Sequence, residues 1–233
     1  MTPPRDGVLV IEASSARGSV AWLRDGRAVD SRVVLMGAGR DDALFPALLD
    51  LLGASTATPR LPATIVCGSG PGSFTSLRIA ASLAKGLAHG AGLPLCAVSS
   101  LLLAAAGAPL TGPETFVVHA DALRSERYML EVGRDTDGRI HARGPVRRVT
   151  PAWLVEHVPP EARVSVGAEP PGVAGWCCVH PEASELARVA PVAYQTPVAL
   201  AVWEPDYGRL AEAQVQWEVT HGVPLPVAGL TPA

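Results

Sequence analysis

The chain has 233 residues, a formal net charge of −3 at neutral pH and a mean hydropathy of +0.24. Apolar residues make up 48% of the sequence and charged residues 18%, which excludes a disordered chain because disorder requires low hydrophobicity and high charge. The near-balanced charge also excludes the strongly basic surface that tight, autonomous binding to nucleic acid requires.

No Asp, Glu, Lys or Arg occurs between Lys85 and Glu114. A membrane span needs roughly 20 consecutive apolar residues. Glycines, prolines and serines interrupt this stretch, so a buried helix, a turn and a buried strand fit it better. The N-terminal residues include Arg5 and Asp6 and do not form a signal peptide. Four cysteines occur without a CxxC motif. We therefore expect a reduced, cytoplasmic protein with no membrane contact.

The first half of the chain opens with short strands and continues with alternating helices and buried strands. A D-G turn signal joins the second strand to the third, which predicts an antiparallel meander. Ser73 and Ser99 are expected to cap two helices. The predicted strands span 8–13, 18–23, 27–36, 63–67 and 94–98, and the predicted helices span 41–52, 74–89 and 100–106.

A break in composition at residues 107–113 separates a second, similar series. Its predicted strands span 115–120, 127–132, 139–149 and 162–166, and its predicted helices span 150–157 and 182–189. Three antiparallel strands followed by alternating helices and strands thus occur twice. This duplicated βββαβαβα pattern predicts an α/β protein with the actin-like (ASKHA, ribonuclease-H-like) fold. The predicted lobes are 1–107 and a smaller 108–233, which ends in a Pro-rich tail.

The strongest local motif is GSGPGSFTSLR at 68–78, between a predicted buried strand and a predicted helix. Glycines permit close approach of the backbone, and amides at a helix start can bind an anion. Two interpretations stay open: an anion or nucleotide contact, or a tight turn that only packs. The motif is neither a Walker loop nor a dinucleotide fingerprint, since it has no Gly-Lys-Ser/Thr and its spacing is GxGxG. The candidate contact residues are Glu12, Gly68, Gly70, Pro71, Gly72, Ser73, Thr75 and Arg78.

The longer segment 68–101, GSGPGSFTSLRIAASLAKGLAHGAGLPLCAVSSL, resembles the signature of the TsaB family. Three other segments agree in the same order: the opening hairpin at 8–26, DALRSERY at 121–128 and PDYGR at 205–209. The resemblance therefore spans nearly the whole chain. The matched residues in the last two segments are Asp121, Glu126, Tyr128, Tyr207 and Arg209.

This resemblance implies an actin-like fold and a non-catalytic dimerisation subunit, one that a tRNA threonylcarbamoyltransferase complex requires. Proteins of the family are similar to the catalytic subunit TsaD, pair with it and work with the ATPase TsaE. The complex places a threonylcarbamoyl group on the adenosine beside the anticodon. The implied partners are a TsaD homologue, a TsaE homologue, a second copy when the chain is alone, and tRNA indirectly. No cofactor is expected to bind tightly to this chain, with ATP and a metal expected only in the partner complex.

Six positions depart from the family pattern. Glu12 replaces an early Asp, Ala13 a Thr and Ser76 a Gly. Arg40 lies near a common His, and Leu123 and Ser125 replace Arg and Gly. Actin-like ATPases use the early Asp to hold a metal-bound water, so ATP hydrolysis by this chain alone is not expected. An independent actin-like ATPase or phosphotransferase stays an alternative function, as does a metallopeptidase.

The metallopeptidase alternative has little support in the residues. The sequence has no HExxH motif and no GxSxG nucleophile elbow. His119 and Asp121, with Glu126 nearby, could form at most a weak metal pair. We therefore predict no catalytic residue and no metal site.

The first two predicted helices carry more apolar surface than one buried face needs. Small residues in the second helix permit the close approach of another helix. Either both helices are buried within their own lobe, or their outer faces form a dimer interface, which the family resemblance favours. The predicted interface residues are Phe45, Leu48, Leu49, Leu52, Leu77, Ala80, Ala81, Ala84 and Leu87.

Overall fold

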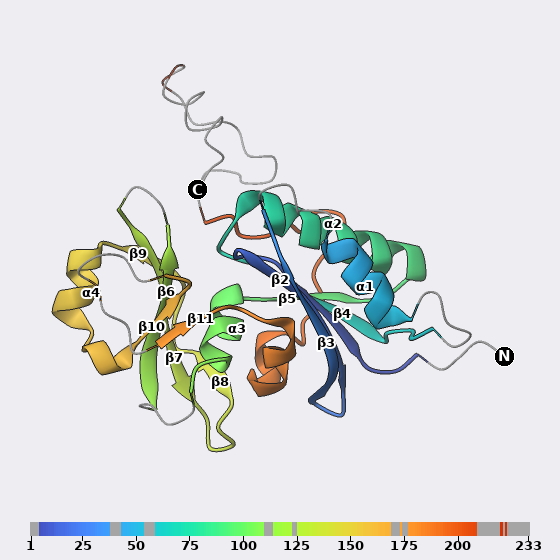
Figure 1. Cartoon of the computed structure of the whole chain (residues 1–233), viewed down its shortest axis with the longest axis horizontal. Coiled ribbons are helices and arrows are strands. Elements are labelled where there is room, and N and C mark those ends of the chain that lie inside the picture. Colours follow the sequence, from blue (N-terminus) through green and yellow to red (C-terminus); the bar gives the residue numbers. More distant parts are fainter. Residues whose placement is uncertain are drawn as a thin grey trace.

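Two β-sheets with a short helix between them organise the part of the chain that the computed structural model describes (Figure 1). The described residues are 5–37, 43–53, 59–109, 114–122, 125–168, 173, 177–208, 220 and 222. Arg40, Leu123 and Arg209 lie outside them, so the predictions at these positions stay predictions. No helix in the described part is long and apolar enough to cross a bilayer.

The first sheet has the strand order β3-β2-β1-β4-β5 among the described residues. β1 (Val8–Glu12), β2 (Arg17–Arg24) and β3 (Arg27–Leu35) form the predicted antiparallel meander. β4 (Thr64–Gly68) and β5 (Leu95–Val98) continue the sheet parallel to β1. Because β1 and β4 are parallel neighbours and Ile11 pairs with Cys67, Glu12 and Gly68 end at the same edge of the sheet.

α1 (Leu44–Leu52) and α2 (Phe74–Ala91) lie over one face of this sheet (Figure 1). Each helix ends at a glycine in the left-handed conformation, Gly53 and Gly92, as helix C-termini commonly do. α1 begins at Leu44 rather than at the predicted position 41. Pro46 therefore lies in the first turn, where its missing N–H breaks no helical hydrogen bond.

Ser73 and Ser99 occupy the predicted N-cap positions, but neither hydroxyl makes a capping hydrogen bond. Ser73 precedes α2, but its hydroxyl lies 3.1 Å from the Ser76 Oγ rather than bonding a backbone amide. Ser99 precedes α3 (Ser100–Ala106) and also makes no capping hydrogen bond. Thr150, by contrast, accepts a hydrogen bond from the Trp153 amide at the start of α4 (Pro151–His157).

The second sheet has the order β11-β10-β6-β7-β8 among the described residues, with β9 also pairing with β7. Its strands are β6 (Thr115–Asp121), β7 (Arg127–Arg134), β8 (Ile140–Ala142), β9 (Arg147–Val149), β10 (Arg163–Val166) and β11 (Cys177–Val179). The prediction of a single strand at 139–149 is wrong. The extended segment is interrupted around Gly144 and Pro145, which gives two short strands, β8 and β9. β11 was not predicted. The helix predicted at 182–189 is a 3-10 helix, η2 (Ala183–Arg188), and shorter 3-10 turns occur at η1 (Pro160–Ala162) and η3 (Pro191–Ala193).

α3 fills the space between the two sheets. All seven of its residues are buried, and they join one face of the first sheet to the second sheet in a continuous apolar cluster. The charge-free stretch of the sequence thus consists mainly of α2, β5 and this central helix. The strands divide between the sheets after β5, and the lobe boundary at 107/108 stays a prediction.

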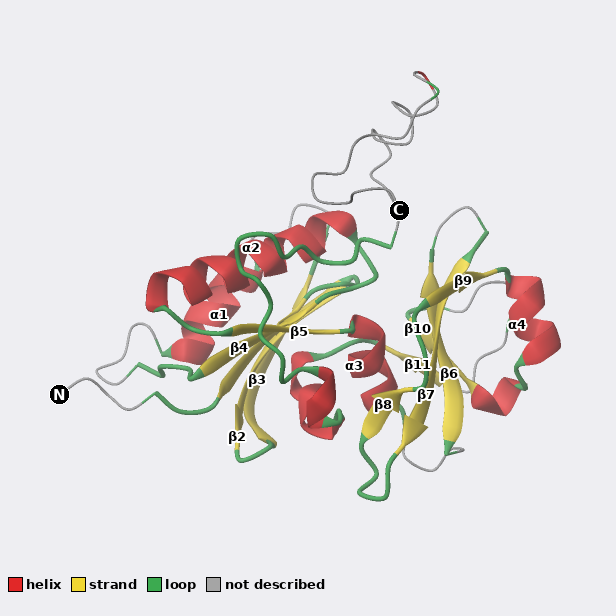
Figure 2. Cartoon of the chain, turned by 180° about the vertical axis from the view of Figure 1, so that it is seen from behind, coloured by secondary structure: helices red, strands yellow, loops and turns green. Residues whose placement is uncertain are grey.

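After η3 the chain returns to the first sheet as an irregular segment, residues 197–208, here called the C-terminal strap. The Val198 amide donates to the Leu95 carbonyl at 2.8 Å, and Lys85 Nζ donates to the Trp203 carbonyl at 2.9 Å. Figure 2 shows this segment as a loop that runs along α2. The strap therefore covers part of the first lobe although it follows the whole second lobe in sequence.

Candidate functional site

Parts of the sequence motifs described above meet at one edge of the first sheet, here called the glycine junction. It comprises the end of β1, the glycine-rich loop 68–72, the start of α3, Tyr128 and strap residues 205–208. The Asp206 amide donates to the Ser69 carbonyl at 2.7 Å. A Cβ at Gly70 would lie 2.3 Å from the Asp206 carbonyl oxygen, and one at Gly208 would lie 2.4 Å from the Tyr128 ring. Segments far apart in sequence are thus packed into one unit.

Glu12 lies at the centre of the glycine junction and is fully buried. One carboxylate oxygen accepts the Ser14 amide, and the other accepts the Ser100 hydroxyl at 2.8 Å. The same Ser100 oxygen accepts the Gly70 amide at 3.0 Å. Burial raises the pKa of Glu12 above its usual value, and the two hydrogen-bond donors oppose that rise. The carboxylate therefore links β1, the loop and α3 inside the protein.

The loop glycines are required by this close packing. A Cβ at Gly68 would lie 1.7 Å from Glu12 Oε2, and one at Gly72 would lie 2.1 Å from the Ser14 carbonyl oxygen. Gly70 has a backbone φ of +90°, which residues other than glycine rarely adopt. The packing interpretation of the motif therefore has a direct structural basis.

The loop amides are largely used within the chain. Ser69 N donates to Val98 O at 2.8 Å and Ser73 N donates to Ser14 O at 2.7 Å, in addition to the Gly70 bond to Ser100. Glu12 is corrected from a candidate ligand contact to a buried structural residue, because both of its oxygens have donors and neither reaches solvent. An anion or nucleotide contact elsewhere on the motif stays a prediction. Pro71 is buried, whereas Ser73, Thr75 and Arg78 are exposed, with the Arg78 guanidinium 4.7 Å from the Phe74 ring centre.

The raised pKa of Glu12 makes stability depend on pH. The protonated acid fits the buried site best, so this contribution is fully present below pH 4.5 and is lost as pH rises through the higher folded-state pKa. We expect the free energy of unfolding of the wild type to fall across that window. The glutamine in Glu12→Gln is neutral, can accept a hydrogen bond from Ser14 and can donate one to Ser100. The variant should therefore lack the part of the fall in the free energy of unfolding that comes from the ionisation of Glu12. Urea denaturation over a pH series measures it, with the exposed Glu204→Gln as control. Parallel curves for Glu12→Gln and the wild type would contradict the assignment.

The weak metal pair suggested at His119 is not supported by its surroundings. His119 is buried, and its Nδ1 lies 3.1 Å from the Arg127 guanidinium. Burial, with the charges of Arg127 and Arg163, lowers the pKa of His119 to about 4. The adjacent Glu126 pairs with Arg148 at 3.6 Å and Asp121 with Arg127 at 3.7 Å. Among the described residues, no group of three or more His, Cys, Asp or Glu side chains could hold a metal ion.

The predicted interface residues divide into buried and exposed groups. Five are buried by the chain's own fold, which corrects their assignment to an exposed surface: Leu48, Leu77, Ala80, Ala81 and Ala84. Leu52 and Leu87 are half-buried. Phe45 and Leu49 on α1 are exposed, with 50% and 39% of their surface accessible. Phe74 at the start of α2 is also 39% exposed, although the interface prediction did not include it.

The burial of these residues has two causes. One stripe of each helix packs on the sheet, and Leu44, Leu48, Ala80 and Ala84 share one apolar cluster there. The strap covers part of the remaining surface, because Val198, Leu200 and Trp203 pack against the same cluster. The exposed apolar surface of the two helices is therefore smaller than the sequence predicted, and its large side chains are Phe45, Leu49 and Phe74.

Comparison with known proteins identifies relatives over most of the chain. The family model described as "TsaD: tRNA N6-adenosine threonylcarbamoyltransferase" matches residues 41–141. Two curated relatives are each described as "tRNA threonylcarbamoyladenosine biosynthesis protein TsaB". The protein of Escherichia coli K12 is 36% identical over 135 residues, and that of Bacillus subtilis 168 is 29% identical over 245 residues. The match spans 58% of this chain and 58% of the E. coli protein, and 90% of this chain and 97% of the B. subtilis protein.

A solved structure agrees in fold. It is an uncharacterized protein with similarity to peptidase YeaZ from Pseudomonas aeruginosa, 26% identical, with a TM-score of 0.71. The superposition covers 88% of this chain and all of that chain. The predicted fold class, a duplicated actin-like α/β fold, is confirmed. The chain is thus similar to TsaB proteins in the signature at 68–101, in its two-sheet fold and over most of its length.

Proposed function

We propose that this chain is a non-catalytic, cytoplasmic subunit for the biosynthesis of threonylcarbamoyladenosine in tRNA, and that it acts by binding a TsaD homologue. The described function of its TsaB relatives supports the pathway. The observation that carries the binding role is the exposed apolar surface of Phe45, Leu49 and Phe74 on α1 and α2. In this proposal a TsaE homologue and tRNA join through the complex rather than through this chain alone.

The non-catalytic role is supported by Glu12. In an actin-like ATPase this position must reach a metal-bound water, whereas here the carboxylate is buried and accepts two internal donors. Steady turnover of ATP by the purified chain alone, lost in Glu12→Ala, would overturn this part of the proposal. ATP turnover that appears only after a TsaD homologue and a TsaE homologue are added agrees with it.

The outer surface of the helix pair suits a helical partner. A Cβ added at Gly86 or Gly90 of α2 would meet nothing within 4 Å, so the surface is open there and a partner backbone can approach closely. Burying a large apolar side chain contributes about 1.5–3 kcal/mol, so Phe45 and Leu49 together can supply a substantial share of an association energy. A second copy of this chain can use the same surface when the partner is absent.

We expect Leu49→Glu to weaken association with a TsaD homologue by about a hundredfold or more, because it places a charge in an apolar contact. Co-purification and sedimentation of the two full chains measure this. Val192→Glu is the matched control, since Val192 is 79% exposed on η3, away from α1 and α2. If Leu49→Glu and Phe45→Glu both assemble like the control, the partner does not bind this surface.

A further inference from the structure

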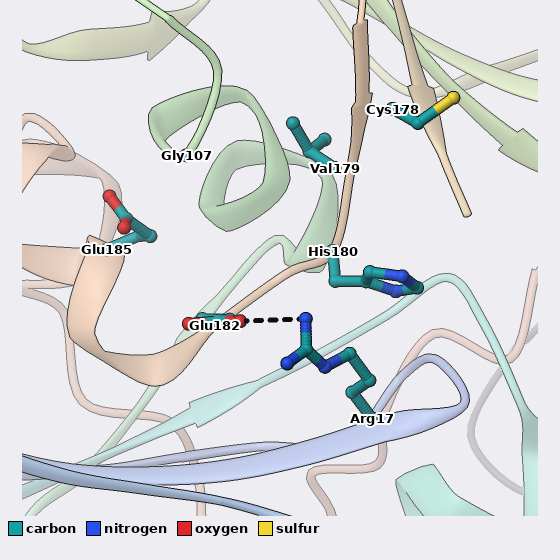
Figure 3. A pocket seen from close by; sticks show the side chains of 7 residues that line it. All are labelled: Arg17, Gly107, Cys178, Val179, His180, Glu182 and Glu185. Carbon is teal, nitrogen blue, oxygen red and sulfur yellow. Dashed lines mark ion pairs between the residues drawn. The ribbon is translucent and has the colours of Figure 1, made fainter. Parts of the chain in front are cut away.

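A cavity of about 280 Å³ lies where the first sheet, the end of α3 and the β11–η2 segment meet (Figure 3). Its polar walls come from Arg17 at the start of β2, His180 after β11, and Glu182 and Glu185 at η2. The residues that line it are distinct from those of the glycine junction. The cavity therefore raises a separate question of what it holds.

The polar groups around the cavity are only partly paired. Arg17 Nη1 lies 3.4 Å from Glu182 Oε1, its sole charged partner among the described residues, as Figure 3 shows. His180 Nδ1 is buried and has no hydrogen-bond partner within the described part of the chain. Glu185 Oε2 is also buried and has only an ion pair, with Arg188 Nη1 at 3.1 Å. Buried polar groups are normally satisfied, so this cluster needs further partners.

The charges around the cavity select the class of ligand. Arg17 pairs with Glu182 and Arg188 pairs with Glu185, so the charges balance, and a ligand with a net charge of either sign would disturb that balance. A zwitterion offers an anionic and a cationic group a few bonds apart and adds no net charge. We propose that this cavity binds a small zwitterion of the α-amino acid class, with its carboxylate on Arg17 and its ammonium toward Glu182 and Glu185.

The remaining features of the cavity agree with this ligand. Burial and the neighbouring Arg17 lower the pKa of His180, so the imidazole is neutral near pH 7 and can hydrogen-bond without adding charge. The volume is below the roughly 300–1,000 Å³ of pockets for drug-sized ligands. Val179 is the one aliphatic side chain among the residues that line the cavity, which favours a short, polar amino acid such as serine or threonine.

Titration of the purified full chain with L-serine and L-threonine tests the proposal, by calorimetry and by the shift in melting temperature. We expect one site per chain and a raised melting temperature. L-lactate lacks the ammonium and L-serine methyl ester lacks the carboxylate, so each should bind at least about tenfold more weakly. Absence of binding by both amino acids, or equal binding of L-lactate or inorganic phosphate, would overturn the proposal.

Arg17→Gln should weaken amino acid binding by about tenfold or more, because it removes the charge that holds the carboxylate. Arg24→Gln is the matched control: Arg24 ends the same strand, pairs with Asp6 and does not line the cavity. Both arginines are partly exposed, so both variants should fold, which circular dichroism checks. Unchanged binding by Arg17→Gln would also overturn the site. Neither outcome bears on association with a TsaD homologue, which is measured separately.

Discussion

Gly68→Ala is expected to lower the free energy of unfolding by about 3–5 kcal/mol, the range for breaking a buried network around a charge. The added Cβ would lie 1.7 Å from Glu12 Oε2, 2.8 Å from Glu12 Cδ and 3.1 Å from Ser100 Oγ. Glu12 is fully buried and both of its oxygens accept hydrogen bonds, so a shift of the carboxylate disturbs these bonds. Either it loses a donor while buried or β1 and β4 move apart.

Urea denaturation measures this loss of stability. Gly86→Ala is the control, because it should raise the free energy of unfolding rather than lower it. Gly86 lies within α2, and a Cβ there would meet nothing within 4 Å. Alanine in a helix is favoured over glycine by about 0.5–1 kcal/mol, so Gly86→Ala should stabilise. Combining Gly68→Ala with Glu12→Ala should cost less than the sum of the two, because the clash is then absent. A cost for Gly68→Ala of less than about 0.5 kcal/mol would contradict the burial of Glu12 against this glycine.

The sequence predicts local features of the first lobe well because their causes are local. The D-G signal at Asp25 and Gly26 gives the β2–β3 hairpin, and both residues adopt positive φ there. The apolar run before Gly68 gives a strand buried along most of its length. The motif after it gives a helix that begins at Phe74, as predicted.

The role of Glu12 could not be predicted in the same way. A glutamate at the end of a strand can face a ligand or lie inside the protein, and the sequence of β1 does not distinguish the two. The outcome depends on the register of β1 with β4, which places Glu12 beside Gly68, and on α3 presenting Ser100 from 88 positions away. Both are consequences of tertiary packing.

The interface prediction failed in part for a similar reason. Helical periodicity identifies two apolar stripes on α1 and α2, but it does not show what covers each stripe. The strap that covers part of them has no periodic pattern. Its Trp203 carbonyl accepts a hydrogen bond from Lys85, which lies 118 positions earlier in the sequence. Leu48 and Leu49 are neighbours in sequence, yet one is buried and the other is 39% exposed.

Gly208→Ala is expected to lower the free energy of unfolding by about 2–4 kcal/mol and to detach the end of the strap from the second lobe. The new Cβ would lie 2.4 Å from Tyr128 Cζ and Oη, and Tyr128 is only 4% exposed, so its ring has little room to move. Gly208 also has φ of +69°, which costs a residue other than glycine about 1–2 kcal/mol. The tilted ring contact of Tyr207 with Phe74, whose ring centres are 4.6 Å apart, should loosen with it.

Gly138→Ala separates the two causes of this effect. Gly138 has φ of +76° but a Cβ there would meet nothing within 4 Å, so its substitution carries the backbone cost without the clash. The difference between the two variants in urea denaturation therefore measures the contact between the strap and Tyr128. Hydrogen exchange should show faster exchange at the Asp206 amide, which bonds Ser69, in Gly208→Ala alone. Equal destabilisation by both variants, with unchanged exchange at Asp206, would mean that Tyr128 yields to the new side chain and that the strap is held mainly by its contacts with β5 and α2.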